Sequence, residues 1–272
     1  MEQTSDISAK PRRNGVSSWI CGQPFSARFW LLPASALAGL AAWLLVVKLG
    51  NYPGFILPTP VAVWARFLRA ASDGSLLRHT VVTLGEVLAG LGLGVSVASV
   101  LGYLLARSRT VERLLSPYIV ASQAVPIVAL APLLVLWFGP GEFSKILICA
   151  LIVFFPVLVN VVVGIRTVEE DLRDLMRSLR ATRWQTFAML ELPAALPVLL
   201  GGLKIGATLS VIGAVVGEFV GADRGLGFLV NVARGQYDTA LVFVAIFTLV
   251  LLALSLYGLV SLAERWLLAW RR

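Results

Sequence analysis

Residues 166–197 have the sequence RTVEEDLRDLMRSLRATRWQTFAMLELPAALP, the one long charged segment in the second half of a very apolar chain. Apolar side chains recur along it at the i, i+3, i+4, i+7 spacing of one helix face: Leu172, Leu175, Met176 and Leu179. Arginines fall on the opposite face: Arg173, Arg177 and Arg180. The pattern predicts an amphipathic helix, followed by a second amphipathic piece and then by Leu192-Pro193.

An amphipathic helix between two apolar runs has two physical interpretations. It can lie in solvent, or on anionic lipid through its arginines. It can also be a docking helix that offers its apolar ridge to a groove on a soluble partner. The helix pattern by itself leaves both interpretations open.

The composition of the chain excludes an ordinary soluble domain. Of the 272 residues, 58% are hydrophobic and only 14% are charged, and the mean hydropathy is +0.86. Such values are typical of an all-α, polytopic membrane protein, so the lipid membrane is an expected partner. The net charge of +8 is explained by arginines gathered on cytoplasmic loops, and no nucleic acid is expected as a partner.

Six runs poor in charge predict about six transmembrane helices: residues 29–47, 81–106, 114–138, 146–165, 197–221 and 239–263. The polar and basic residues 1–28 predict a disordered cytoplasmic tail, and residues 29–267 predict the transmembrane domain. The third run carries Pro117, Pro126 and Pro132, which predict kinks or a locally broken helix.

The basic residues indicate an orientation. Six spans place both termini on one side of the membrane. With the tail inside, 15 of the 23 Lys and Arg residues fall in inner segments, within residues 1–28, 107–113, 166–183 and 265–272, and seven fall in outer loops. Because positive residues are enriched on the cytoplasmic side, both termini and the charged segment are expected in the cytoplasm.

Glycines in the fifth run lie on one helix face, at spacings of four that allow close helix–helix approach: Gly202 and Gly206, then Gly213, Gly217 and Gly221. This face can pack within the chain or against a second copy of the chain. The sequence leaves both arrangements open.

The charged segment resembles the cytoplasmic loop of ABC-importer permeases. Their signature is Glu-Ala-Ala, three residues, Gly, nine residues, Ile, one residue and Leu-Pro. Anchored on Leu192-Pro193, the signature places its Glu-Ala-Ala at residues 174–176, its Gly at Arg180 and its Ile at Leu190. Arg180 is the largest departure, because the glycine of the signature permits a sharp turn that a Cβ atom resists.

Further blocks over residues 57–264 resemble the nitrate, sulfonate and taurine group of these permeases, which includes permeases for thiamine precursors and riboflavin. The blocks are Ile56–Pro60, Ala131–Leu133, Trp137–Gly139 with Gly141, Glu142 and Lys145, Phe155-Pro156 and Gly225–Gly227. The block at residues 216–222, VGEFVGA, is slightly closer to the vitamin and pyrimidine-precursor branch.

The resemblance implies the transmembrane domain of a type-1 ABC importer in a bacterial inner membrane. It implies a permease subunit that carries a small solute: a vitamin or pyrimidine precursor such as riboflavin or a thiamine precursor, with nitrate, sulfonate or taurine close behind. The implied partners are cytoplasmic ATPase subunits, an external substrate-binding protein, and a second permease copy or homologue. The sequence lacks a Gly-x-x-x-x-Gly-Lys-Ser/Thr phosphate loop, so the energy is expected to come from a separate ATPase.

Two sets of residues are candidates for function. The resemblance implies that the cytoplasmic coupling loop, residues 166–197, docks on the ATPase through Leu172, Asp174, Leu175, Met176, Leu179, Arg180 and Ala181. Polar residues within spans are candidates for lining the translocation path: Glu86, Asn160, Lys204 and Glu218. Structural roles are also open for this second set, since the two acids lie near span ends and Lys204 can snorkel.

Two other classes of protein are alternatives to an ABC permease. An ion-coupled secondary transporter or channel is the main alternative, since such proteins carry acids within the membrane. An enzyme is disfavoured, because His79 is the single histidine and no His-Glu-x-x-His or Gly-x-Ser-x-Gly motif is present. No catalytic residue, metal site or cofactor is expected.

Overall fold

The apolar runs form helices, and every regular element in the described part of the chain, residues 25–271 of the computed structural model, is helical. The chain divides into two units, residues 1–52 and residues 53–272. In the first unit, helix α1 spans Phe25–Gly50 and contains the first predicted span. The predicted tail lies outside the described residues except for residues 25–28, which belong to α1.

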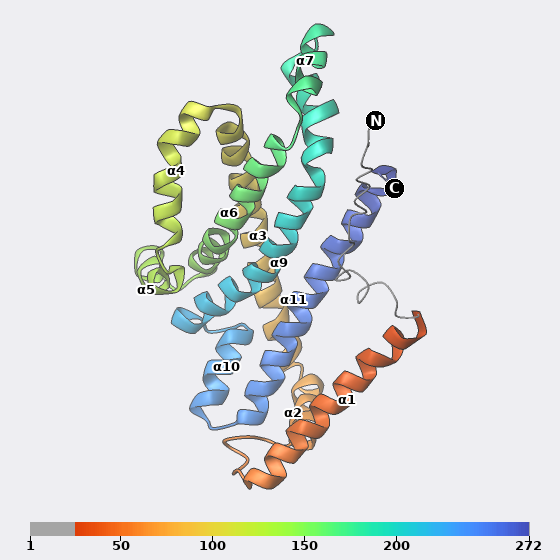
Figure 1. Cartoon of the computed structure of the whole chain (residues 1–272). Coiled ribbons are helices and arrows are strands. Elements are labelled where there is room, and N and C mark those ends of the chain that lie inside the picture. The colour runs from red at the N-terminus through yellow and green to blue at the C-terminus, as the bar shows by residue number, and fades with distance from the viewer. Residues whose placement is uncertain (1–24, 272) are drawn as a thin grey trace, which may run out of the picture. The chain divides into compact units, whose positions relative to one another are not determined.

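The second unit holds the other elements, drawn in Figure 1. They are α2 (Pro60–Ser72), α3 (Ser75–Arg107), α4 (Arg109–Gln123), α5 (Ile127–Phe138), α6 (Glu142–Arg166), α7 (Glu170–Ser178), α8 (Arg183–Thr186), the π-helical turn η1 (Phe187–Glu191), α9 (Leu192–Gly221), α10 (Leu226–Gly235), α11 (Thr239–Leu267) and the 3-10 turn η2 (Ala269–Arg271).

Five helical segments in the described chain are long and apolar enough to cross a membrane, and each contains one of the predicted spans or most of it. The third predicted span is instead divided into α4 and α5. Pro126 stands at the break as the residue before α5, since it has no amide hydrogen to continue a helix. At 12 residues, α5 is only about 18 Å long. Pro117 and Pro132 lie inside α4 and α5 without ending them.

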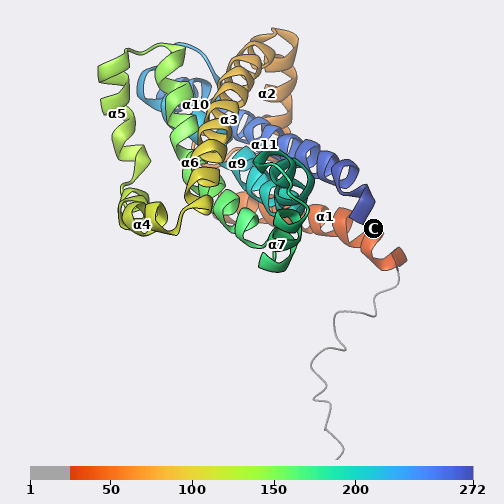
Figure 2. The ribbon, with the colours of Figure 1, turned by 90° about the horizontal axis from the view of Figure 1, so that it is seen from above.

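Helix α6 packs against both α3 and α9, and these three helices form the most extensively packed part of the unit (Figure 2). Glycines on both neighbours face α6. A Cβ atom at Gly94 of α3 would lie 2.7 Å from the carbonyl oxygen of Ala150, and one at Gly213 of α9 would lie 2.7 Å from the Cα of Cys149. The glycine face of α9 therefore packs within the chain, which decides between the two arrangements left open above.

Helices α10 and α11 follow α9 and pack against it. Helix α11 packs against α9 and α10, and α2 packs against α11. Asp238 begins α11 by accepting a hydrogen bond from the backbone N–H of Leu241, and it also pairs with Arg66 of α2 at 2.7 Å. One carboxylate therefore caps a long helix and fixes a short helix beside it.

The chain turns sharply after α7, and Arg180 makes the turn. Its φ is +51°, in the left-handed region that usually favours glycine. The N–H of Ala181 donates to the carbonyl of Met176 and the N–H of Arg180 donates to that of Arg177, at 3.0 and 2.9 Å. This pair of bonds is a common helix C-terminal cap, normally built on glycine. The turn expected of the signature glycine is thus made by arginine.

The junction between α8 and α9 is one turn of π-helix, in which the N–H of Leu192 donates to the carbonyl of Phe187. Pro193 follows directly. In an α-helix its ring would crowd the carbonyl of Met189, four residues earlier. The wider turn relieves this crowding, and isolated π-turns of this kind often occur at functional positions.

Replacing Gly213 with alanine should destabilise the protein by about 1–3 kcal/mol, because the new methyl group meets backbone that cannot move aside alone. The matched control is Gly201→Ala on the same helix, where a Cβ has nothing within 4 Å. The control should be neutral or stabilising by up to about 1 kcal/mol. Thermal unfolding of the detergent-solubilised protein measures both variants, and equal melting temperatures would contradict the packing described.

Replacing Arg180 with glycine should stabilise the end of α7 by about 1 kcal/mol, because glycine adopts a positive φ without the Cβ penalty. Hydrogen exchange at the Leu179 and Ala181 amides, corrected for intrinsic rates, should slow roughly fivefold. Arg180→Ala is the control, because it removes the guanidinium but keeps the Cβ. Equal slowing in both variants would mean that the charge, not the backbone, strains this turn.

Candidate functional site

Helix α7 presents its apolar side chains outward. The α7 ridge consists of Leu172, Leu175, Met176 and Leu179. Its three leucines are 41%, 54% and 69% exposed in chain order, and Met176 is half-buried. Asp174 is also exposed and pairs with Arg177 at 2.6 Å. Arg180 is exposed at the turn, and Ala181 follows it, half-buried.

The opposite face of α7 is turned toward the rest of the unit and is anchored by Arg173. The Arg173 Nη2 donates to the carbonyl of Ile165, in the last turn of α6, at 2.7 Å. The Arg173 Nε lies 3.8 Å from an oxygen of Glu191. Arg173 lies opposite the ridge, as the spacing predicts, but this face contacts protein. The helix therefore has the reverse of the usual arrangement, in which the apolar face is covered.

Glu191 joins α3, α7 and the π-turn, although it was not among the predicted site residues. Its side chain is 3% exposed and accepts hydrogen bonds from Arg107 Nη2 at 2.9 Å and from the Tyr103 hydroxyl at 3.1 Å. The Tyr103 ring in turn packs edge-on against Phe187, with centroids 5.0 Å apart. The available signal was a lone acid within an apolar stretch, directly before Leu192-Pro193.

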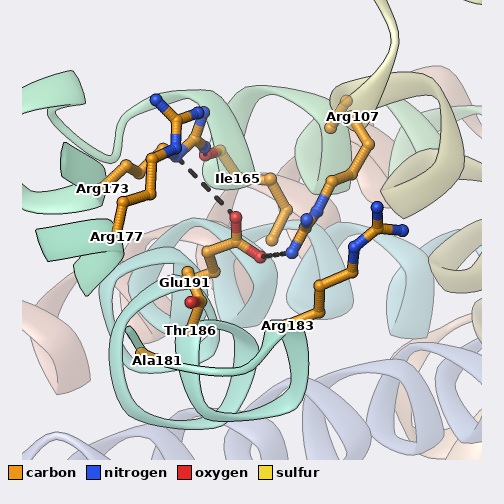
Figure 3. Close-up of a pocket in the computed structure, with 9 residues that line it drawn as sticks. Arg107, Ile165, Arg173, Arg177, Ala181, Arg183, Thr186 and Glu191 are labelled. Atoms are coloured by element: carbon orange, nitrogen blue, oxygen red, sulfur yellow. Dashed lines mark hydrogen bonds and ion pairs between the residues drawn. The ribbon is translucent and has the colours of Figure 1, made fainter. Parts of the chain in front are cut away.

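A cavity of about 390 Å³ opens beside Glu191, where the ends of α3 and α6 meet α7 and α8. Its charged lining is one acid and four arginines, here called the arginine pocket: Glu191, Arg107, Arg173, Arg177 and Arg183. Figure 3 shows Arg173 and Arg177 on one side of Glu191 and Arg107 and Arg183 on the other. The pocket is therefore strongly positive.

A second charged cluster is buried near the opposite ends of the same helices. The ammonium of Lys145 on α6 lies 2.7 Å from Glu86 on α3, and the two side chains are only 4% and 3% exposed. Glu218 of α9 is also buried, and it accepts hydrogen bonds from the Thr83 hydroxyl and the N–H of Gly227. The structure thus brings two predicted path residues, Glu86 and Glu218, into one cluster within the protein interior.

Lys145 was assigned to an outer loop from sequence, because it stands close to a Gly-Pro-Gly turn. It is buried in the first turn of α6 instead. Its partner Glu86 is 59 residues earlier in the chain. A local pattern carries no signal for such a pair. The sequence pointed only to the two acids, Glu86 and Glu218, as charged residues within apolar runs.

The other two predicted path residues lie apart from this cluster. Lys204 of α9 forms an ion pair with Glu264 of α11, and its ammonium lies 5.7 Å from the centroid of the Tyr257 ring. Asn160 of α6 lines an open cavity of about 410 Å³, whose other walls are apolar and include Phe155 and Ile127. Asn160 is therefore the one predicted path residue that borders either of the cavities described here.

The described residues offer no group of three or more His, Cys, Asp or Glu side chains that could hold a metal ion. The arrangement is suited to docking and to a path between helices. Its polar groups join helices through ion pairs and hydrogen bonds.

Comparison with known proteins bears on this arrangement. Residues 90–268, more than half of the chain, match the family model of the binding-protein-dependent transport system inner membrane component. The chain is 48% identical over 239 residues to the riboflavin transport system permease protein RibX of Chloroflexus aurantiacus, covering 88% of this chain and 89% of that one.

Two further proteins are similar. The formylaminopyrimidine transport permease protein ThiX of Halalkalibacterium halodurans is 35% identical over 233 residues, covering 86% of this chain and 92% of that one. A solved structure of the MetNI methionine ABC transporter in inward-facing conformations matches with a TM-score of 0.65 and 19% identity, covering 72% of this chain and 98% of that one. This last likeness concerns the fold.

The predicted resemblance is confirmed by the family match and the relatives. The helical fold agrees with that of an ABC importer's membrane domain. The chain belongs to the family of binding-protein-dependent transport system inner membrane components, the permease subunits of ABC importers, which are transporters and not enzymes.

Proposed function

We propose that this permease carries riboflavin, or a related vitamin precursor with a flat nitrogen-containing ring, into a bacterial cell. An external binding protein delivers the solute and a separate cytoplasmic ATPase supplies the energy. The choice of substrate is based on the 48% identity to a riboflavin permease over most of both chains. A formylaminopyrimidine permease is also similar. Sulfonate and taurine remain the competing substrates.

The observation that carries the ATPase docking is the exposed α7 ridge. Three leucines stand outward while Arg173, on the reverse face, is bonded to α6. Apolar surface left in water costs roughly 25 cal/mol for each Å². A groove on a soluble partner removes that cost, and a ridge at i, i+3, i+4 and i+7 is how a helix fills such a groove. Asp174, Arg180 and Ala181 border the ridge and complete the docking surface.

The orientation of the chain in the membrane is inferred from the basic residues near α7. Arginines gather at this end of the helices. Arg107, at the end of α3, and the arginines of α7 and α8 line the arginine pocket, and Arg166 lies at the end of α6. Basic residues favour the cytoplasmic side. We therefore infer that α7 and both termini of this multi-pass inner-membrane protein lie in the cytoplasm, on the side where the ATPase works.

The assembly contains two permease subunits, as two copies of this chain or one copy and a homologue. Each chain offers one α7 ridge, and ATPases of this kind work in pairs. The path then runs between the two subunits. Asn160 and Phe155 suit that path, because an aromatic ring can stack on a flat solute and an amide can bond its polar edge.

Glu86, Lys204 and Glu218 have a different role in this proposal. Each already has a charged or hydrogen-bonding partner on another helix or loop. Breaking a buried ion pair is costly, so these groups hold helices together. Their arrangement gives no reason to prefer an ion-coupled carrier.

The substrate is tested by uptake into cells that lack their own riboflavin importer and produce this chain with its ATPase and binding protein. Labelled riboflavin should accumulate, and ATPase-inactive complexes should not support accumulation. Taurine, an anionic solute without a ring, is the control. Uptake of taurine without uptake of riboflavin would contradict the proposed substrate.

Docking is tested by placing a charge on the ridge. Leu172→Glu should abolish uptake and weaken ATPase co-purification roughly 100-fold, because burying an unpaired carboxylate costs several kcal/mol. Ser178→Glu is the control: it adds the same charge to α7 about 120° around the helix, on an exposed residue off the ridge.

Ser178 also lies at the C-terminal end of α7, whereas Leu172 lies near its N-terminal end. A negative charge destabilises an isolated helix more at its C-terminal end than at its N-terminal end. A smaller effect of Ser178→Glu therefore cannot come from a milder disturbance of α7. Membrane insertion of both variants should be normal. If Leu172→Glu binds the ATPase and transports as the unaltered protein does, α7 does not dock through this ridge.

A further inference from the structure

The arginine pocket contains more positive charge than the protein neutralises. Glu191 is the one acid in its lining, and it already accepts a bond from Arg107 and lies near Arg173. Arg177 is paired with Asp174 on the exposed surface of α7. The guanidinium of Arg183 forms no ion pair or hydrogen bond within the described part of the chain. The lining of the pocket therefore carries a net positive charge that its own acid does not balance.

The lining also contains a buried donor without an acceptor. The Nε of Arg173 is removed from solvent and has no hydrogen-bond partner, since its 3.8 Å separation from Glu191 is too long for a hydrogen bond. An unsatisfied buried donor is costly to the protein. The unpaired Nε leaves the charge of Arg173 only partly compensated by Glu191, and the other nitrogens of this guanidinium are the ones that a ligand in the pocket would contact.

The chemistry of the lining points to phosphate. A guanidinium presents parallel N–H groups that match two oxygens of a phosphate group, and several guanidiniums can share one phosphate. The volume of about 390 Å³ lies within the range of ordinary ligand sites, about 300–1,000 Å³. A phosphodiester fits such a cavity and leaves its substituents outside.

The position of the pocket indicates where the phosphate comes from. Arg107 is the last residue of α3 and Ile165 is the penultimate residue of α6, and both helices are candidate membrane spans. The pocket thus lies at the level where the hydrocarbon region ends and lipid phosphates begin. Trp184, in the same short helix as Arg183, is largely exposed, and tryptophan is enriched at this depth.

We propose that the arginine pocket binds the phosphate of an anionic phospholipid, through Arg183, Arg173 and Arg107. The bound phosphate bridges α8 to α7 and to the end of α3, and so fixes the base from which the α7 ridge projects. The site is on the reverse side of α7 from the ridge and does not depend on which solute is carried. Basic pockets between membrane helices at the cytoplasmic side are suited to such headgroups.

The test uses the full-length chain, solubilised and stripped of lipid, with binding followed by native mass spectrometry and by thermal unfolding. The probes are phosphatidylglycerol, phosphatidylcholine with the same acyl chains, and inorganic phosphate. Phosphatidylglycerol should bind at least tenfold more tightly than phosphatidylcholine and raise the melting temperature. Inorganic phosphate that stabilises as well as phosphatidylglycerol would overturn the lipid as the source.

Arg183→Gln is the informative variant, because Arg183 is exposed and carries no bond whose loss would unfold the protein. It should lower the affinity for phosphatidylglycerol roughly tenfold, and Arg183→Lys should restore only part of it. Arg224→Gln is the control, an exposed arginine beyond the other end of α9 that pairs only with its neighbour Asp223.

Two outcomes for Arg183→Gln would overturn the proposal. One is equal affinity of Arg183→Gln and the unaltered chain for phosphatidylglycerol. The other is a defect of Arg183→Gln confined to binding of the ATPase, with lipid binding unchanged, which would assign the pocket to a carboxylate of that subunit. An equal loss in Arg224→Gln would show general charge attraction and would likewise contradict a built site.

Discussion

The close approach of α3 and α9 to α6 is the constraint on which the rest of the structure depends. Cys149 of α6 touches both neighbours, because Gly90 and Gly213 leave room for it. The same closeness places the polar groups. A Cβ atom at Gly217 would lie 3.2 Å from the Cβ and Cγ atoms of Lys145, so the glycine leaves room for the stem of this lysine, whose ammonium reaches Glu86. Small residues are the usual means of such contact in membranes.

An acid fixes the chain at each end of this three-helix core. At one end Glu218 holds the turn before α10 by accepting the N–H of Gly227, and Thr83 ties α3 to both sides of that turn. At the other end Glu191 holds the π-turn against Arg107. The core is therefore rigid at both ends, and α7 leaves it from a fixed base. A docking helix on a fixed base can transmit a push from a partner to the spans, whereas a loosely tethered one cannot.

Local patterns in the sequence were sufficient for five of the six predicted spans and for the α7 ridge, because each is encoded by neighbouring residues. For the third span they indicated kinks or a broken helix, without showing that the break falls at Pro126. They were insufficient for Lys145 and Glu191. The partners of these residues, Glu86 and Arg107, are 59 and 84 positions away, and a charge seen alone in sequence is most simply assigned to a loop. Arg180 shows a third kind of limit: the sequence marked the missing glycine, but only the backbone angle shows that arginine makes the turn.

The reversed arrangement of α7 has a consequence for the supply of subunits. If the ATPase docks on the α7 ridge as proposed, a permease made in excess of its ATPase keeps Leu172, Leu175 and Leu179 exposed to water. Exposed apolar patches of this kind promote aggregation and degradation by quality-control proteases. We therefore expect the ATPase to act as a chaperone for this subunit, so that the number of permeases in a cell follows the number of ATPases available to cover them.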